Sequence, residues 1–563
     1  MSINQIFSLY LGVVGGGLGL VGGVWGVQEI VLLEWEVFYL GGMFLSFPII
    51  LDSVSLVFSG VVLMISGVVF WYSEFYMAGE LYPSRFYLLT LMFVGSMSFL
   101  IFVPNVVSLL IGWDGLGLIS FCLVIYYQNK KSLASGVITV LMNRVGDACL
   151  IMVVVGVSCF GDWSLFYQKD LGIVLSVLIV VGGLTKSAQI PFSAWLPAAM
   201  SAPTPISALV HSSTLVTAGV YLIIRFYSSV FSSDFVGSGV LLVGFTTSVM
   251  ASLSAVLESD LKKVVALSTL SQLGLMFCAM SFVGPVVCLF HLVMHSLFKS
   301  LLFLSMGNII HMVGGSQDLR SVGGLYKQLP LTVSCMNVSF LAMSGVPFLA
   351  AFYSKDMIVH CAFEGVYGGM ILFMFFFSLA LTVPYCLRLS YYLVCGSLGS
   401  PSVLCYGDSD KDGLFPMIVL VLGSLVGGSV FSRVLVPNFS VVCNWGGFLA
   451  PVVSLFMGVY LAGVLLKFPG GVGGGGKSES FWGGLWFLGD LASKPVSVVV
   501  MSVSGTMLKS CDQGWVEHMT SKSFERVFYT ASGLMLTSQV SSLKSSVLFL
   551  GGCVLGVLVF GQF

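Results

Sequence analysis

Isolated charges within long apolar stretches are the residues of this sequence that could do chemistry. Lys186 is the only formal charge between Asp170 and Arg225. An ammonium group in hydrocarbon is costly, and such residues usually face a bundle interior or a water-filled cavity and have a function. A lysine near a helix end can instead reach the membrane surface. Because Pro191 and Pro197 follow within the same uncharged run, the pattern favours a charge at a break in a helix.

A second isolated lysine repeats this pattern. Lys355 lies 169 residues after the first lysine, with Pro347 ahead of it and Asp356, a supporting charge, directly behind it. The spacing predicts two five-span units, 86–229 and 235–395, each with a broken, lysine-bearing helix in fourth place. Because five is odd, consecutive units enter the membrane from opposite sides. This inverted-repeat arrangement is typical of secondary transporters.

Carboxylates in the first unit are candidates for pairing with the lysine. Asp114 is the only formal charge between Arg85 and Lys130. An unpaired buried carboxylate is protonated or needs a cation nearby. Arg144 and Asp147 stand three residues apart, which places them on one helix face. They either support the first carboxylate or simply neutralise each other, and the sequence leaves both readings open.

Histidines mark a possible connection between the two units. His291, His295 and Lys299 follow one another at four-residue intervals and therefore form one stripe on a helix. A single buried histidine is usually a satisfied core residue. Two histidines in line with a lysine are more typical of proton transfer, because histidine titrates near neutral pH. His211 precedes hydroxyl residues 212–214, which could hold water beside it.

Composition identifies the elements that must position these residues. Of 563 residues, 57% are hydrophobic and 8% are charged, and the mean hydropathy is +1.03, which excludes a soluble protein of this length. Uncharged runs of the length of a membrane span predict an all-α polytopic membrane protein. We predict fifteen spans, at about 6–27, 53–73, 86–103, 105–127, 133–160, 171–200, 204–229, 235–257, 263–283, 285–312, 330–366, 367–395, 414–434, 447–466 and 546–562.

The remaining segments complete the predicted organisation. Residues 1–85 hold the N-terminal spans, and the first apolar run reads as a span rather than a removed signal because no basic residues precede it. Residues 396–483 hold additional spans and a glycine-rich joint. Residues 484–545 mix apolar and charged side chains and predict a lateral interfacial helical segment. Residues 546–563 form a C-terminal anchor span.

Several functions are disfavoured by the same sequence. A net charge of −1 provides no basic field for nucleic acid. The thirteen cysteines are scattered singly, without the spacing of a zinc or iron-sulfur site. Motifs for binding phosphates or dinucleotides are missing from the sequence. We therefore predict no metal and no cofactor on this chain.

At these positions the chain resembles the antiporter-like membrane subunits of mitochondrial NADH:ubiquinone oxidoreductase, complex I, and their bacterial counterparts. The resemblance is strong over residues 40–395. The predicted lateral segment, residues 484–545, favours the subunit of this family that also has a lateral helical segment. It rests on residues 112–117, 143–147, 186–189, 203–214, 260–274, 291–299 and 352–356.

The resemblance implies a subunit that translocates protons across the mitochondrial inner membrane and is driven by redox chemistry elsewhere. NAD, FMN, iron-sulfur clusters and ubiquinone are expected on other subunits. The expected partners are other membrane subunits, including neighbouring antiporter-like ones, and membrane lipids. The alternatives are a subunit of a multisubunit cation/proton antiporter and a structural bundle with internal ion pairs.

Site residues carried over from the family have definite roles. Asp114 and Lys186 would form the paired charge of the first unit, and Lys355 would be the lysine of the second unit, near the exit. The family usually has Glu where this chain has Asp114, so the pair should be bridged by water or its helices should be closer. The hydrated connection between the units would consist of His211, His291, His295 and Lys299.

Overall fold

Helices make up most of the computed structural model. It describes residues 3–25, 29–40, 43–161, 163–164, 171–364, 369–396, 407–408, 410–436, 445–467, 477–540 and 543–561. Contacts divide the chain into two units, Met1–Gly489 and Asp490–Phe563. The all-α membrane fold that the composition predicts is confirmed, with one exception near the N-terminus.

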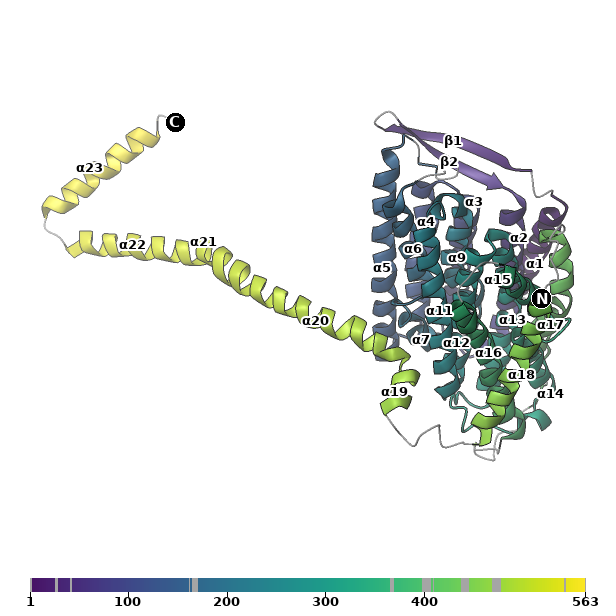
Figure 1. Cartoon of the computed structure of the whole chain (residues 1–563). Coiled ribbons are helices and arrows are strands. Elements are labelled where there is room, and N and C mark those ends of the chain that lie inside the picture. The colour runs from purple at the N-terminus through teal and green to yellow at the C-terminus, as the bar shows by residue number, and fades with distance from the viewer. Residues whose placement is uncertain are drawn as a thin grey trace. The chain divides into compact units, whose positions relative to one another are not determined.

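That exception is an antiparallel hairpin at one end of the helices (Figure 1). Strand β1 (Val31–Leu40) pairs with β2 (Met43–Leu51) between helices α1 (Ile3–Val24) and α2 (Ser53–Tyr76). The sequence analysis assigned residues 1–85 to spans and predicted no strand, so it was incomplete here. The reason is that β1 is rich in β-branched and aromatic residues and is interrupted by two glutamates, a composition that suits a strand rather than a span.

Residues 86–229, which the sequence analysis predicts as one five-span unit, contain a broken helix. The helix that begins at Ile173 ends at Lys186, and its chain continues through short helices, so the predicted span 171–200 is interrupted as its prolines indicated. Its elements are α3 (Pro83–Phe102), α4 (Val106–Val124), α5 (Lys130–Ser158), α6 (Ile173–Lys186), α7 (Trp195–Ala198), η2 (Ala199–Ser201), α8 (Thr204–Leu209), η3 (Val210–Thr214), α9 (Leu215–Arg225) and α10 (Tyr227–Val230).

Residues 235–395, the second predicted unit, contain another broken helix. The predicted span 330–366 is two helices, because Gly345 adopts a left-handed conformation with φ of 90° and ends the first of them. The elements are α11 (Asp234–Leu257), α12 (Leu261–Phe282), α13 (Pro285–Met312), η4 (Leu325–Lys327), α14 (Pro330–Ser344), α15 (Ala350–Glu364) and α16 (Gly369–Cys395).

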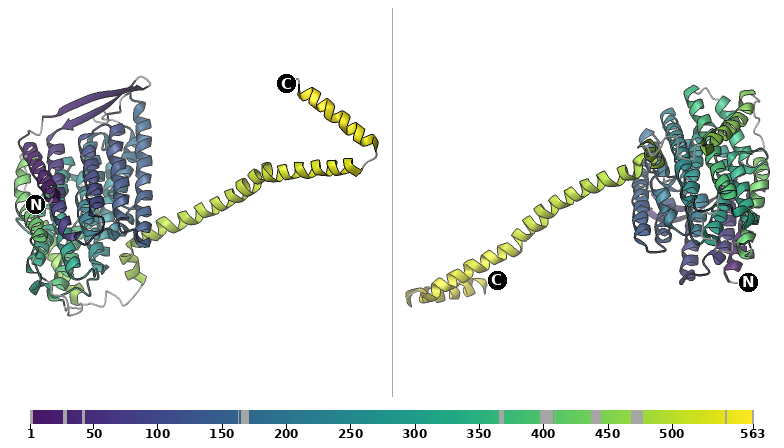
Figure 2. Two further views of the ribbon diagram at one scale, coloured as in Figure 1. Left: turned by 180° about the vertical axis from the view of Figure 1, so that it is seen from behind. Right: turned by 90° about the horizontal axis from the view of Figure 1, so that it is seen from below.

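Further helices follow these two units. They are α17 (Lys411–Leu435), α18 (Trp445–Lys467), α19 (Lys477–Gly483) and η5 (Leu485–Phe487), and then α20 (Leu488–Met507), η6 (Leu508–Val516), α21 (Glu517–Met519), α22 (Ser521–Val540) and α23 (Leu543–Phe560). From α20 to α22 the helices follow one another end to end (Figure 2). The predicted glycine joint at 469–476 lies outside the described residues.

The number of membrane crossings stays a prediction. Among the described residues, thirteen helices are long and apolar enough to cross a membrane, and three shorter apolar helices are α6, α14 and part of α23. The thirteen include 485–537, which the sequence analysis places along the membrane.

The core of the bundle lies around α8, α9, α12 and α13, whose residues are almost all buried. Helix α1 packs against α2 at the rim (Figure 2). Gly183 and Gly219 face each other where α6 meets α9, and a side chain at either position would crowd the opposite backbone. Small residues allow this close helix contact, which fixes the end of α6 deep in the bundle.

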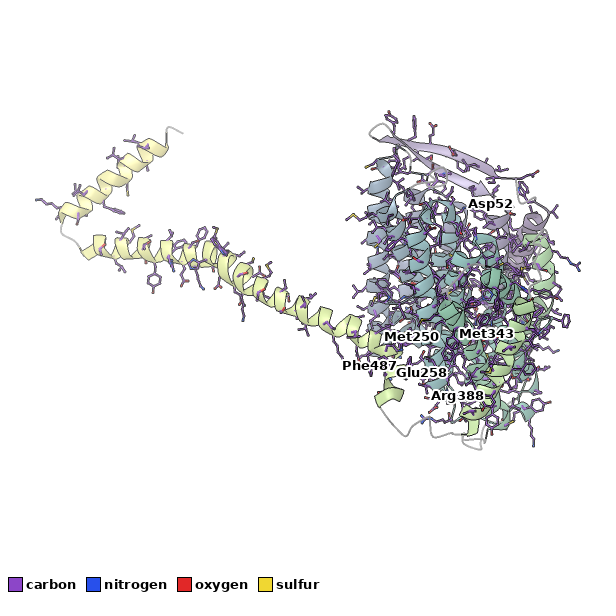
Figure 3. All side chains as sticks on the ribbon, viewed as in Figure 1. Asp52, Met250, Glu258, Met343, Arg388 and Phe487 are labelled. Carbon is purple, nitrogen blue, oxygen red and sulfur yellow. The ribbon has the colours of Figure 1, made fainter. Side chains whose placement is uncertain are left out.

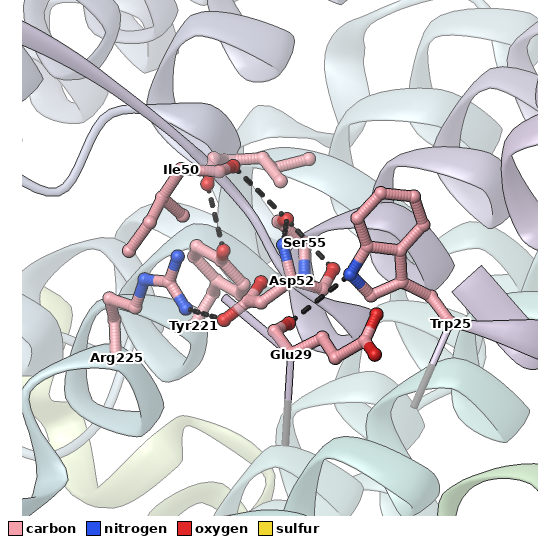
Figure 4. A network of polar contacts seen from close by, with 8 residues as sticks. Trp25, Glu29, Ile50, Asp52, Ser55, Tyr221 and Arg225 are labelled. Atoms are coloured by element: carbon pink, nitrogen blue, oxygen red, sulfur yellow. Dashed lines mark hydrogen bonds and ion pairs between the residues drawn. The ribbon is translucent and has the colours of Figure 1, made fainter. Parts of the chain in front are cut away.

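A buried ion pair joins the start of α2 to the end of α9 (Figure 4). Asp52 caps α2, accepting a hydrogen bond from the Ser55 backbone at 2.8 Å, while its own amide donates to the Ser55 hydroxyl. Its other carboxylate oxygen lies 2.5 Å from Nη1 of Arg225. Beside it, the Tyr221 hydroxyl donates to the Ile101 carbonyl. The network therefore ties together elements that are distant in sequence.

We expect Arg225→Met to lower the amount of assembled protein. The change leaves the Asp52 carboxylate buried without its cation, and removal of one partner of a buried pair typically costs about 3–5 kcal/mol. Native gels and thermal aggregation of the purified protein would measure the loss. The matched control is Arg320→Met, because Arg320 pairs with Asp318 at 2.7 Å on the exposed surface, where ion pairs contribute little. Equal assembly of the two variants would contradict this prediction.

Candidate functional site: buried lysines at two helix breaks

Lys186 is the last residue of α6 and is completely buried. Its Nζ donates a hydrogen bond of 2.5 Å to the backbone carbonyl of Trp113 on α4. The same amine lies 3.8 Å from the centre of the Trp113 ring. The predicted burial of this charge at a helix break is therefore observed, and its direct partner is a neutral residue that the sequence analysis did not select.

Side chains satisfy the backbone where α6 is broken. The indole of Trp195 donates to the carbonyl of Thr185 at 3.0 Å. Gln189 donates to the Ser187 carbonyl at 3.2 Å and accepts from the hydroxyl of Thr247 on α11 at 2.5 Å. Non-helical backbone at membrane depth is tolerated only where protein or water satisfies it. These hydrogen bonds therefore stabilise the non-helical backbone that follows Lys186.

A chain of contacts connects Lys186 to two carboxylates by way of Trp113. The indole Nε1 of Trp113 donates to Asp147 at 2.8 Å. Asp147 also lies 3.1 Å from Arg144, three residues earlier on α5, as their spacing predicts. Arg144 in turn lies 3.6 Å from Asp114. The order of contacts is therefore lysine, tryptophan, aspartate, arginine and aspartate.

Asp114, which the resemblance pairs with Lys186, has a different ion-pair partner in the structure. Among the described residues its ion-pair partner is Arg144, and its side chain is 45% exposed. The physical reason is helix geometry, because successive residues of a helix point about 100° apart. Trp113 faces the lysine, so the neighbouring carboxylate points toward α5 and the outer face. A water-bridged interaction remains a prediction.

His211 lies in a π-helical turn, η3, in the middle of the buried α8–α9 segment. Such turns are frequent at functional sites. Neither ring nitrogen has a hydrogen-bond partner among the described residues. The Trp195 ring lies 6.1 Å away. The neighbouring hydroxyls of Ser213 and Thr214 bond to the Leu209 carbonyl, so their donor protons turn away from the imidazole.

The predicted stripe of α13 is buried along its whole length. His291 Nδ1 lies 2.8 Å from the Ser354 hydroxyl of α15. His295 has no partner on either ring nitrogen among the described residues. Lys299 donates to the Ser268 hydroxyl of α12 at 2.5 Å. The stripe thus contacts the other helices of its unit through hydroxyl groups.

Lys355 lies in the second turn of α15, the helix that follows the second break, and is also buried. Its Nζ donates to the carbonyl of Met343, labelled in Figure 3, at 2.5 Å. A cavity of about 20 Å³ next to it is lined by Asp356 and Ser454, among others, and one water needs about 10–15 Å³. Asp356 lies 3.8 Å from His360, one turn further along α15.

Hydroxyl groups lie between the two lysines of the second unit. Ser271, one turn after Ser268 on α12, approaches the Tyr385 hydroxyl at 3.5 Å. Tyr385 in turn lies 3.9 Å from the Met343 sulfur, on the residue whose carbonyl binds Lys355. Sequence reasoning missed Trp113, Tyr385 and the serines because it searched for charges. Neutral groups at these positions have no local signal.

The site is suited to proton exchange. It contains buried amines that bond to hydroxyl or backbone oxygens, and buried imidazoles, of which His291 approaches a hydroxyl. No group of three or more histidine, cysteine, aspartate or glutamate side chains that could hold a metal lies within the described part of the chain. The arrangement defines a polytopic membrane protein with two lysine-bearing broken helices.

Comparisons with known proteins identify the class. Residues 103–382 match the family described as NADH:quinone oxidoreductase/Mrp antiporter, TM, and residues 385–561 match NADH dehydrogenase subunit 5 C-terminus. A similar solved structure is the Mrp complex from Dietzia sp. DQ12-45-1b, with a TM-score of 0.73 and 23% identity, over 95% of this chain and 62% of that chain. The chain therefore has the antiporter-like fold.

Curated relatives identify the family within this class. NADH-ubiquinone oxidoreductase chain 5 of Anopheles gambiae is 42% identical over 499 residues, which are 87% of this chain and 86% of the relative. The same protein of Locusta migratoria is 43% identical, and that of Mytilus edulis 41%, each over 86% of both chains. This chain belongs to the family of NADH-ubiquinone oxidoreductase chain 5.

Proposed function

We propose that this chain carries protons across the membrane through Lys186, Lys299 and Lys355. As a family member it is a proton-translocating membrane subunit of NADH-ubiquinone oxidoreductase. The observation that carries the proposal is that each of the three buried amines bonds to a neutral oxygen. Such an ammonium group can release its proton without leaving a directly bonded carboxylate buried and unpaired.

Histidines and water would connect these amines. The ring nitrogens of His211 and His295 have no partner among the described residues. Buried polar groups almost always have a hydrogen-bond partner, which can be water. We therefore place water beside both imidazoles, so that protons pass from the first unit along the α13 stripe. Lys355 then passes its proton to the cavity beside Asp356, near the exit.

Two exposed charged side chains indicate where a partner subunit binds this chain. Asp114 and Arg144 lie in the middle of apolar helices with side chains 45% and 44% exposed. Charged groups facing lipid are costly, so another membrane subunit should cover this face of α4 and α5. We propose that it is a neighbouring antiporter-like subunit, and that residues 484–545 run along such neighbours. NAD, FMN, iron-sulfur clusters and ubiquinone would bind to other subunits. We place this chain in the mitochondrial inner membrane.

The alternative, a subunit of a multisubunit cation/proton antiporter, rests on the fold likeness. The match of residues 385–561 to the NADH dehydrogenase subunit 5 C-terminus favours the first reading. Sodium-dependent transport without NADH oxidation would favour the antiporter.

The test is to replace Lys299. We expect Lys299→Met to reduce the protons translocated per NADH oxidised, because the α13 stripe loses its amine and Ser268 its donor. The measurement uses proteoliposomes that contain the purified complex. Lys262→Met is the matched control. Lys262, on α12, is buried like Lys299, but it donates to the backbone carbonyl of Ala202 at 3.2 Å and lies outside the α13 stripe. An unchanged ratio in Lys299→Met would overturn the proposed path.

A further inference from the structure

We infer that Trp113 is a positioning residue that holds the Lys186 ammonium group against its ring face and the Asp147 carboxylate at its ring edge. This inference rests on the proposed function of Lys186. Trp113 is completely buried. It makes three polar contacts, through its carbonyl and its ring face with Lys186 and through Nε1 with Asp147.

The two ring contacts act on opposite charges. The face of an indole attracts a cation, and this attraction is strongest where water is excluded. The indole N–H is a donor only, so it binds the carboxylate and cannot accept a proton from it. Trp113 therefore separates the lysine from Asp147 and at the same time fixes the position of each. A direct ion pair would instead bind the two charges together.

The consequence is that the lysine can exchange its proton while the carboxylate stays held. A change of rotamer in the Lys186 side chain would move its amine off the Trp113 ring. Asp147 would meanwhile keep both the indole and Arg144 as partners. The ring thus favours the protonated amine in one position. Proton transfer to and from Lys186 should depend on this contact even though Trp113 carries no proton itself.

The surroundings of Lys186 contain few other charges. Those that act on it are Asp147, Asp114 and Arg144. Helices α5, α9, α10 and α11 pack against α6. Beyond α5, their titratable residues are Tyr221 and Arg225 of α9, which are bonded to Ile101 and Asp52, Tyr227 of α10 and Asp234 of α11. A change at Trp113 should therefore appear in the pH profile through Lys186 and Asp147.

The test compares Trp113→Leu and Trp113→Phe in the purified complex reconstituted into proteoliposomes. Leucine removes both ring contacts, while phenylalanine retains a ring face and loses the N–H. We expect the alkaline limb of the pH profile of proton translocation to move to lower pH, by about one unit or tenfold in Trp113→Leu and about half a unit or threefold in Trp113→Phe. A residue that only fills space would change the amount of complex without moving the profile.

The matched control is Trp71→Phe. Trp71 also donates its indole N–H to a carboxylate, that of Asp412 at 3.3 Å, but lies away from Lys186. Its pH profile should stay that of the wild type. If Trp113→Leu does not assemble, Trp113→Phe decides, because phenylalanine preserves most of the ring volume. A profile of Trp113→Phe equal to that of Trp71→Phe would overturn the inference.

Lys186→Ala in the same series separates two kinds of failure. If Lys186→Ala loses proton translocation while the Trp113 variants match the wild type, the path stands and only the role of the tryptophan is wrong. If Lys186→Ala pumps normally, the proposed function of Lys186 is itself wrong.

Discussion

Replacement of Lys186 by alanine is expected to reduce proton translocation strongly while the subunit still inserts and assembles. The amine is buried at the end of α6 and bonded to a backbone carbonyl, so alanine removes the proton-carrying group without exposing a charge. Loss of a positioned proton-transfer group typically costs about 10²-fold or more in rate. Protons per NADH in proteoliposomes and native gels of the complex would measure the two effects separately.

Lys186→Arg is the informative companion variant. Arginine keeps the positive charge and can still donate to the Trp113 carbonyl, but it does not release its proton in proteins. We therefore expect this variant to fail like alanine. A wild-type proton yield in Lys186→Arg would show that the residue contributes only charge.

Asp147→Asn is expected to impair proton translocation more than Asp114→Asn. The amide oxygen of the new side chain can still accept a hydrogen bond from the Trp113 indole. The negative charge on the other side of that ring from Lys186 is lost, however. We expect a loss of about tenfold, which corresponds to about 1.4 kcal/mol. Asp114→Asn leaves Arg144 with its closer partner at 3.1 Å, so the loss should be smaller. Protons per NADH in proteoliposomes would measure both variants.

This order reverses the one that the resemblance implied, in which Asp114 is the partner of the lysine. Asp114→Glu retains the charge at a half-exposed position and should be tolerated. Both asparagine substitutions are nearly isosteric, which makes the comparison direct. A larger loss in Asp114→Asn than in Asp147→Asn would return the pairing role to Asp114.

Much of the architecture follows from local sequence. The apolar runs specify spans because only helices satisfy the backbone in lipid. The breaks at Lys186 and Gly345 follow from proline and glycine, which restrict or release the backbone at those residues. The stripe from His291 to Lys299 follows from the helical repeat. Each of these properties depends on residues that are close in the chain.

The partners of the buried charges depend on contacts between distant helices. Helical spacing says that Trp113 and Asp114 point in different directions, but which one faces Lys186 depends on how α4, α5 and α6 pack. That packing depends on shape, such as the close approach of Gly183 to Gly219. A neutral indole between two charges, and a hairpin closed by strand pairing, therefore emerge only when the helices are assembled.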